Sequence, residues 1–461
     1  MACRWIAMVL ATTVGCGGAA GAGDAGSSGS SSSSTGSTGT STTSTGVDTS
    51  SSSSSSSTGD GPDLPDDETE VIRVQVDYDM TRGYTLGAIK HERSGTSTLG
   101  ARARSIDPLG SFAGVLSDPD TGAEVYRQTL GTGLAYAAIA RGLSFRFPAF
   151  DEPLDFTLLA ETPNEATLMP VFEATIDPAA VVDAPVLDGI TTMVLREATQ
   201  EPSLQLVIYA EGYDAESEDR FFYDAGRVVF VLEQADFPGL GYLDISAVYR
   251  ASLDPLGEPE DLGEPVPVPD SFLGMRHPYW ADFFMRWQQL AYPVDEEKFR
   301  DAVAQVPYDY PFVLIDSDAY WGTGNFNAFV AVPAANEDFA YLVEHETAHY
   351  FGLQEEYSTG GTELIFAPGV EPWSQNLSFA TELADIKWHD LIEAGTPIPT
   401  PSDAWEQYGI GAYAGGYGGL DDRSRVPTPE GICTMSSGPE YCDVCRGAIT
   451  AKLEYDLVGA P

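Results

Sequence analysis

The stretch VEHETAHYFGLQEEY, residues 343–357, contains two of the five histidines in this chain of 461 residues. His345 and His349 are four residues apart, so on a helix both imidazoles project from the same side. Two neutral imidazoles in that arrangement can bind one Zn²⁺. Glu346 is offset by one residue, which lets its carboxylate reach a water molecule beside the metal without being a ligand. The motif therefore predicts a zinc site with Glu346 as the general base that activates water for attack on a carbonyl.

The residues around the motif predict that it lies on a helix. Asn336 is expected to cap this helix, with Glu337 and Asp338 in a first turn where acidic side chains complement the helix dipole. Gly352 is placed to end it. Histidine is rare in this chain, at 5 of 461 residues, so a chance HExxH on a well-capped helix would be rarer still. These features favour a metal site over a coincidental pattern.

Zinc also needs a third protein ligand. HETAHYFGLQE follows the pattern HExxHxxGxxH, in which a glycine turns the chain and the last position returns to the metal. Glu355 occupies that last position and Glu356 follows it, and a carboxylate is an acceptable zinc ligand. One of these two glutamates is expected to bind, with Glu355 preferred. The alternative is that both are surface charges and that the ligand lies elsewhere; His389, the one histidine further along, is expected on a helix surface.

Two short segments before this helix have recognisable patterns. NAFVAV, residues 327–332, predicts a strand leading into the helix, and such a strand can pair with an extended peptide. The preceding WGTGN, residues 321–325, predicts a tight glycine loop.

The charge of the chain restricts its partners. It has 70 acidic and 23 basic residues, a formal net charge of −47. Binding to nucleic acid or to an anionic membrane surface takes clustered lysine and arginine, so neither partner is expected. The acidity is typical of a solvated surface. Calcium is the sharper alternative, but no ordered DxDxDG loop supports it.

The N-terminus predicts export. A basic start, MACR, precedes an apolar run of ten residues that is too short to span a bilayer and fits a signal peptide over residues 1–15. The run ends in TVGC, which resembles a lipoprotein box with Cys16 as the lipidated residue; ordinary signal cleavage is the alternative. Residues 16–69, rich in glycine, serine and threonine, predict a flexible tether. We therefore expect an exported lipoprotein at the outer membrane or cell surface, or otherwise a secreted protein.

Three further cysteines crowd near the C-terminus, at Cys433, Cys442 and Cys445. In an exported protein this number favours one disulfide with a leftover thiol, in a pairing that the sequence leaves open. A structural zinc site would want a fourth ligand, and no other histidine or cysteine lies nearby.

Two domains are expected after the tether. Residues 70–185 show short alternating stretches such as VIRVQVDYD (71–79), with turn residues between them, and predict a β-sandwich-like domain. Residues 186–461 alternate strands with helices, which predicts a mixed α/β domain holding the motif. Its expected strands lie within 204–214, 242–252 and 310–317, and its expected helices span 216–234 and 295–306.

The second domain resembles the bacterial IgA-peptidase-type zinc metallopeptidase family, which is metzincin-like. The likeness runs from LVIYAEGYDAESEDRFFYDAGRVV through YPFVLIDSDAYWGTGN, HETAHYFGLQEEY and GAYAGGYGG to ICTMSSGPEYCDVCRGAI, covering most of 195–450. It implies that His345 and His349 bind zinc, that Glu346 is the base and that the EEY segment carries the third ligand. It also implies that Met435 lies in a turn beneath the metal. The chain departs from the family at Ala348 and Ala414, and it is one residue shorter before EEY.

The sequence as a whole predicts a zinc-dependent endopeptidase that hydrolyses peptide bonds of extracellular proteins. Its partner is expected to be a protein or peptide substrate, with membrane contact only through the lipid anchor. Nothing in the residues encodes a preference for immunoglobulin or an oligomeric state. Two alternatives remain: a catalytically silent surface lipoprotein that uses the same fold for binding, and a zinc hydrolase that acts on another bond.

Overall fold

The computed structural model describes residues 70–79, 81–92, 110–131, 140–161, 167–254, 270–276, 291–319, 322–357, 371–416 and 424–458. The expected signal peptide, the lipidation residue Cys16 and the tether over 16–69 lie outside these ranges and stay predictions. In the part of the chain that is described, every helix is too short or too polar to cross a bilayer.

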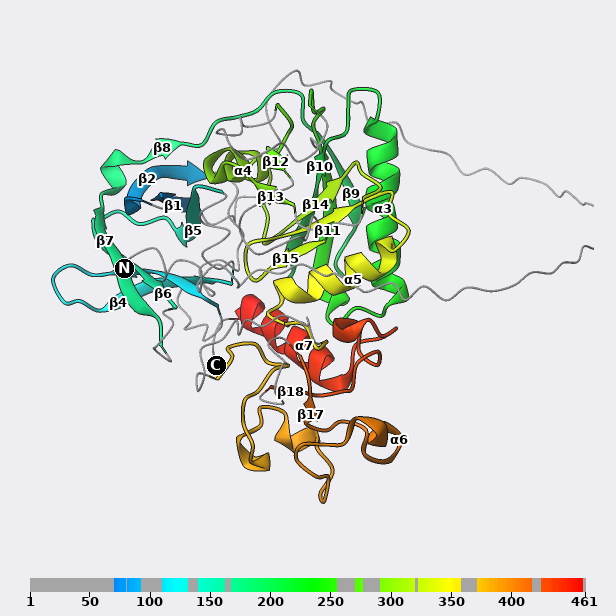
Figure 1. The fold of residues 1–461 in the computed structure, drawn as a ribbon. Helices are drawn as coiled ribbons and strands as arrows, with labels where there is room; N and C mark the ends of the chain where they lie inside the picture. The colour runs from blue at the N-terminus through cyan, green and yellow to red at the C-terminus, as the bar shows by residue number, and fades with distance from the viewer. Residues whose placement is uncertain are drawn as a thin grey trace, which may run out of the picture. The chain divides into compact units, whose positions relative to one another are not determined.

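Two four-stranded sheets form the N-terminal part (Figure 1). Their strand orders are β5-β1-β2-β8 and β4-β3-β6-β7, and all pairs are antiparallel except the short pair β2–β8. The bounds are β1 Val71–Asp79, β2 Gly83–Glu92, β5 Gly142–Pro148 and β8 Val182–Asp183 in the first sheet, and β3 Phe112–Ser117, β4 Glu124–Leu130, β6 Leu154–Ala160 and β7 Met169–Ile176 in the second.

Aromatic side chains fill the space between these two sheets. The rings of Phe145 in β5 and Phe156 in β6 have centroids 5.9 Å apart. Gly114 of β3 faces both of them, and a Cβ there would lie 2.6 Å from the Phe145 ring. The rings of Phe145 and Phe156 thus occupy the space above Gly114, where β3 has no side chain of its own.

A six-stranded mixed sheet forms the second half of the described chain, in the order β15-β16-β14-β10-β11-β9. The four central strands are parallel, and β15 and β9 are antiparallel edge strands. The bounds are β9 Thr191–Arg196, β10 Leu204–Glu211, β11 Leu243–Tyr249, β14 Tyr310–Ile315, β15 Thr323–Asn325 and β16 Phe329–Pro333.

Side chains of the central strands alternate between two hydrophobic clusters. Ile208 of β10 belongs to the cluster that contains α3, α5 and α7, whereas Val207 belongs to the one that contains α4 and both N-terminal sheets. Parallel strands covered on both faces require apolar residues at every position, which explains the continuous run LVIYA in β10. Figure 1 shows α3 running alongside these strands. The helices are α3 Glu218–Gln234, α4 Glu296–Val303, α5 Phe339–Tyr350 and α7 Asp443–Val458.

A buried charge network joins the N-terminal sheets to this second part. Arg73 donates to Glu92 at 2.7 Å and also pairs with Asp301 of α4. Arg146 donates to the other oxygen of Glu92 at 2.8 Å and to the carbonyl of Tyr308 at 2.9 Å. Because each buried charge has a partner, the network avoids the cost of an isolated buried ion.

Short elements complete the described chain. They are β12 Met275–Arg276 with β13 Tyr292–Pro293, β17 Tyr413–Ala414 with β18 Arg425–Val426, α6 Trp405–Tyr408, and the 3-10 helices η3 Pro178–Ala180, η4 Leu240–Tyr242, η5 Leu383–Asp385, η6 His389–Leu391, η7 Ser402–Ala404 and η8 Thr434–Ser436.

The predicted helices over 216–234 and 295–306 are confirmed as α3 and α4. The helix with the motif begins two residues later than predicted. Its first residue is Phe339, and Asp338, not Asn336, is the cap position. Asn336 instead closes the turn before the helix, where its side-chain oxygen accepts from the Asp338 N–H at 2.8 Å.

The two segments before α5, 327–332 and 321–325, also differ in part from expectation. The strand predicted over 327–332 is β16, but it lies inside the sheet between β14 and β15 and has no edge open for a peptide. The predicted loop 321–325 contains β15, which is the edge strand. Gly324, which lies within β15, is explained by a close contact with α5 that is described below, and not by a turn.

Candidate metal centre

The motif lies on α5 and is buried. His345 and Glu346 are both fully buried, and His349 is nearly so. The helix ends as predicted, with Gly352 in the left-handed region at φ 89°. A helix with such burial presents imidazoles to the protein interior, where they need partners.

Backbone carbonyls fix how the two imidazoles point. The Nδ1 atom of His345 lies 2.9 Å from the carbonyl oxygen of Thr434, and that of His349 lies 2.8 Å from the carbonyl oxygen of Leu353. A carbonyl only accepts hydrogen bonds, so each Nδ1 carries the hydrogen in the neutral ring. Each Nε2 then presents its lone pair, which is the arrangement of a histidine ready to bind metal.

Donor atoms from three residues converge at this point. The Nε2 atoms of His345 and His349 are 3.1 Å apart. Oε2 of Glu355 lies 3.2 Å from Nε2 of His345, and Oε1 of the same carboxylate lies 3.4 Å from Nε2 of His349. Ligands about 2.0–2.1 Å from a tetrahedral zinc ion lie about 3.3 Å from one another. The triangle formed by these two imidazoles and this carboxylate therefore has the spacing of three ligands that share one zinc ion, with the fourth position left for water or substrate.

The pKa values show the mutual attraction of these groups in the metal-free chain. Burial lowers the pKa of His349, but the charge of Glu355 and its hydrogen bond outweigh burial and raise that pKa to about 9. Burial raises the pKa of Glu355, while the two histidines outweigh it and hold the pKa well below its usual range. A proton on His349 thus occupies the position that a metal ion would take, and metal uptake displaces it.

Glu356 points to a different group of residues. Its carboxylate is buried and accepts from the thiol of Cys445, with Sγ and Oε1 2.9 Å apart. Burial is the main reason that its pKa lies well above the ordinary value. Of the two neighbouring glutamates, the structure brings Glu355, and not Glu356, to the histidines.

The edge strand β15 runs directly against the motif. A Cβ at Gly322 would collide with the Glu346 carboxylate, and one at Gly324 would collide with the Glu346 carbonyl and lie 2.6 Å from His349 Cβ. At Gly324 the collision is with the backbone of α5, so only glycine permits the approach there. The close contact places the edge strand β15 beside Glu346 and the two histidines.

Two supporting residues were not predicted from the sequence. The Tyr341 hydroxyl lies 2.9 Å from Nδ1 of His345, one helical turn away, and that spacing was the available signal. Thr434 supplies the carbonyl that orients His345, and no local pattern indicates it. Met435 follows it and is fully buried, and its carbonyl accepts from the Glu356 N–H at 2.9 Å. His389 lies exposed on η6, away from these contacts.

The cysteines do not form the disulfide that the sequence favours. All three thiols are free in the structure. The Sγ atoms of Cys433 and Cys445 are 3.7 Å apart, whereas a disulfide bond is about 2.0 Å long.

Together, a mixed α/β sheet and a helix that presents two histidines and a buried glutamate define a metallopeptidase-like site. Residues 193–409 match the model of the family described as IgA Peptidase M64, a range that runs from β9 to α6 and includes α5. The chain therefore carries an IgA Peptidase M64 domain, and the resemblance found in the sequence is confirmed. A domain of this family implies the activity of a metallopeptidase. No curated protein matches the chain.

Proposed function

We propose that this protein is a zinc-dependent endopeptidase that hydrolyses peptide bonds of extracellular proteins. His345, His349 and Glu355 would hold the metal, and Glu346 would be the general base. The observation that carries the proposal is the triangle of two imidazoles and one carboxylate, in which each Nε2 lies 3.1 Å from the other and 3.2 or 3.4 Å from an oxygen of Glu355.

The donor set favours zinc over calcium and magnesium. Two imidazoles and one carboxylate form a ligand set of catalytic zinc sites, which keep a fourth position open. Calcium and magnesium prefer sites built from oxygen atoms alone. The fit of these residues to zinc therefore rests on both their spacing and their chemistry.

In the reaction, zinc would supply a Lewis acid that lowers the pKa of a water molecule and polarises the substrate carbonyl. Glu346 would accept one proton of the water on its carboxylate as the oxygen attacks the carbonyl carbon. The C–N bond then breaks, and Glu346 returns the proton to the departing nitrogen. The second proton of the water passes from the new carboxylic acid to the amine, so the products are a carboxylate and an ammonium group, and no covalent bond to the protein forms.

The substrate is proposed to bind along β15. This strand pairs with β16 on one side, and its other side is the end of the sheet order. An extended peptide can add to such an edge through main-chain hydrogen bonds, largely independent of sequence. Because Gly322 and Gly324 bring this edge against Glu346, a peptide bound there would pass the base.

We also propose the organisation predicted from the sequence. Residues 1–15 would be a signal peptide, Cys16 the lipidated residue, and 16–69 a tether for an exported protein. Residues 70–185 would form the β-sandwich-like domain and 186–461 the zinc peptidase domain. The order of an apolar run, a cysteine and a low-complexity segment is that of a lipoprotein N-terminus, which supports this proposal. Cys16→Ser should abolish labelling of the protein by radioactive palmitate.

A non-catalytic surface lipoprotein is the second candidate. It is favoured by Ala414, an exposed residue on β17, where the family pattern would have a glutamate. Loss of a substrate-contacting glutamate would weaken turnover and leave the metal triangle intact.

The test compares the purified protein with Glu346→Ala. We expect cleavage of a mixed protein substrate that chelation and the substitution both abolish, with bound zinc unchanged in the variant. Zinc at the histidines without cleavage across many substrates would support the binding protein. Failure of His345→Ala and His349→Ala to lower the zinc content would overturn the proposed centre.

A further inference from the structure

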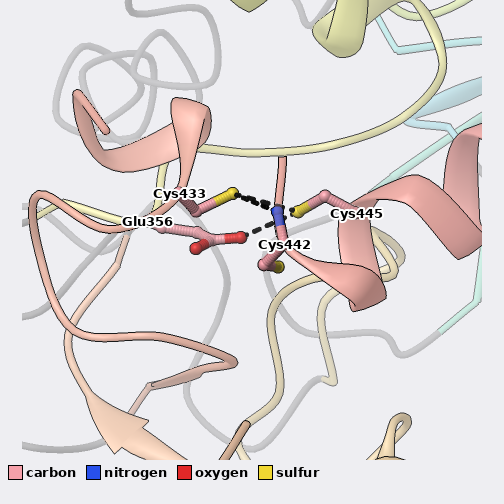
Figure 2. A group of neighbouring side chains, drawn as sticks. All are labelled: Glu356, Cys433, Cys442 and Cys445. Atoms are coloured by element: carbon pink, nitrogen blue, oxygen red, sulfur yellow. Dashed lines mark hydrogen bonds between the residues drawn. The ribbon is translucent and has the colours of Figure 1, made fainter. Parts of the chain in front are cut away.

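A second cluster of metal-ligating side chains follows directly from the position of Glu356. Figure 2 shows Glu356, Cys433, Cys442 and Cys445 converging from three segments of the chain. One ligand atom from each residue lies within 4.8 Å of every other. Glu356, Cys433 and Cys445 are buried, and Cys442 is partly buried.

We propose that these four residues form a structural site for a second zinc ion. Structural zinc sites are closed tetrahedra of four protein ligands rich in cysteine. Two sulfurs that are each about 2.3 Å from a tetrahedral zinc ion lie about 3.8 Å apart. The Sγ atoms of Cys433 and Cys445 are separated by 3.7 Å. The spacing is therefore that of two thiolates sharing one ion.

The backbone around the cysteines is arranged for thiolate ligands. Cys442 and Cys445 have the C-x₂-C spacing of zinc-binding turns. The N–H of Cys442 donates to the sulfur of Cys433 at 3.4 Å (Figure 2). Cys445 lies in the first turn of α7, which begins at Asp443, and the positive end of a helix stabilises a thiolate. These contacts offset the negative charge that a cluster of thiolates and a carboxylate collects.

Neutral donors hold the carboxylate of Glu356 in place. Asn376 donates to its Oε1 at 3.1 Å and Thr428 to its Oε2 at 3.2 Å. The Glu356 side chain is only 1% exposed, so its ionised form is costly to bury, and a bound metal ion would offset that cost with a positive charge. Hydrogen bonds of this kind also orient a metal ligand.

The second site would stabilise the first by fixing two of its segments. Glu355 and Glu356 are neighbours, so an ion bound to Glu356 restrains the backbone that carries the third ligand of the catalytic centre. Cys433 precedes Thr434, whose carbonyl orients His345. The link is completed by the hydrogen bond from the Glu356 N–H to the carbonyl of Met435. The second ion is thus a positioning element that does not touch substrate.

The first experiment separates the two sites by their ligand chemistry. The full chain is loaded with Co²⁺, since thiolate ligands give a near-ultraviolet charge-transfer band that histidine and carboxylate ligands do not. We expect two metal ions per chain in the wild type and one in His349→Ala, which keeps the band. Cys445→Ser should also bind one ion and lose the band. Cys16→Ser, which replaces a cysteine outside the cluster, should keep both ions and the band.

A second measurement remains decisive if Cys445→Ser fails to fold. X-ray absorption of zinc-loaded His349→Ala should show sulfur neighbours at about 2.3 Å. A sulfur-free spectrum, or a folded wild type that binds a single ion without the cobalt band, would overturn the second site. Neither result would bear on the catalytic centre, because cleavage and its dependence on Glu346 are measured separately.

The disulfide alternative has its own direct test. Trypsin cuts after Arg425 and Arg446, and the peptide 426–446 contains Cys433, Cys442 and Cys445 and no other cysteine. After metal removal without reductant, we expect all three to be alkylated. One alkylated cysteine and a mass lower by two hydrogens would show a disulfide, and the zinc proposal would be wrong.

Discussion

Glu355 and Glu356 are adjacent in the sequence, yet they face two different groups of ligands. Glu355 meets two histidines that lie on the preceding helix, whereas Glu356 meets three cysteines close to the C-terminus. The first group is contained in one short segment, and the second joins segments far apart in the chain. A compact ligand pattern is visible in a sequence, and a dispersed one becomes visible only when the fold brings its parts together.

The largest expected effect comes from removing the proposed base. Glu346→Gln keeps the shape of the side chain but cannot accept a proton, so we expect kcat to fall by about 10²- to 10⁴-fold. Zinc content should stay unchanged, as measured by metal analysis of the purified variant. Glu344→Gln makes the same change two residues earlier on α5, at a half-buried position outside the triangle, and should retain activity. Equal losses in both variants would contradict the assignment.

The two neighbouring glutamates provide a matched pair. Glu355→Gln should lose the ion held by the histidines, together with nearly all activity. Glu356→Gln should keep that ion but lower activity by about 10- to 100-fold, the range for residues that orient a metal ligand. Metal content and cleavage rate, measured on both variants, check the contrast. If Glu356→Gln lost the catalytic ion and Glu355→Gln kept it, the two roles would have to be exchanged.

The metal-free and zinc-loaded proteins should respond to pH in opposite directions. The pKa of His349 is raised from 6.5 to about 9, so its stabilising contribution is complete below pH 6.5 and is lost as pH rises through 9. We expect the free energy of unfolding of the metal-free protein to fall by about 3 kcal/mol across this window. Zinc binding needs the deprotonated ring, so zinc should stabilise more as pH rises.

Urea unfolding at pH 6.5 and pH 9, with and without zinc, measures both slopes. Metal-free His349→Ala should lose this pH dependence. Glu355 has a lowered pKa, so its contribution is present above its ordinary value and is lost only in acid, outside this window. A metal-free protein that became more stable between pH 6.5 and pH 9 would contradict the proposed attraction.

The smallest expected effect concerns the contact between β15 and α5. Gly324→Ala would place a Cβ against the backbone of the helix, and overpacking of this kind costs about 1–3 kcal/mol. Gly226→Ala, within α3 and with open space at its Cβ, should instead stabilise by about 0.5–1 kcal/mol. Thermal unfolding compares the two. Equal stability of both variants would mean that the strand does not need glycine there.

The parts that could be predicted are those whose signals are local. The four-residue spacing of His345 and His349, the apolar run of β10 and the helical period of α3 are each visible within a short stretch of sequence. The structure contains the corresponding elements. The position of β16 inside the sheet could not be predicted, because strand order depends on pairing between distant segments. The same holds for Thr434 and Asn376, whose roles rest on contacts with residues far along the chain.

The contact between His345 and Thr434 has a consequence for the timing of synthesis. A ribosome adds the residues of α5 well before it adds the segment that carries Thr434, so the motif is present for a time without the carbonyl that orients its first histidine. The cysteines follow later still. An unfinished or truncated chain therefore holds the motif without the surroundings that align it, and the order of synthesis itself delays assembly of the centre until nearly the whole protein has been made.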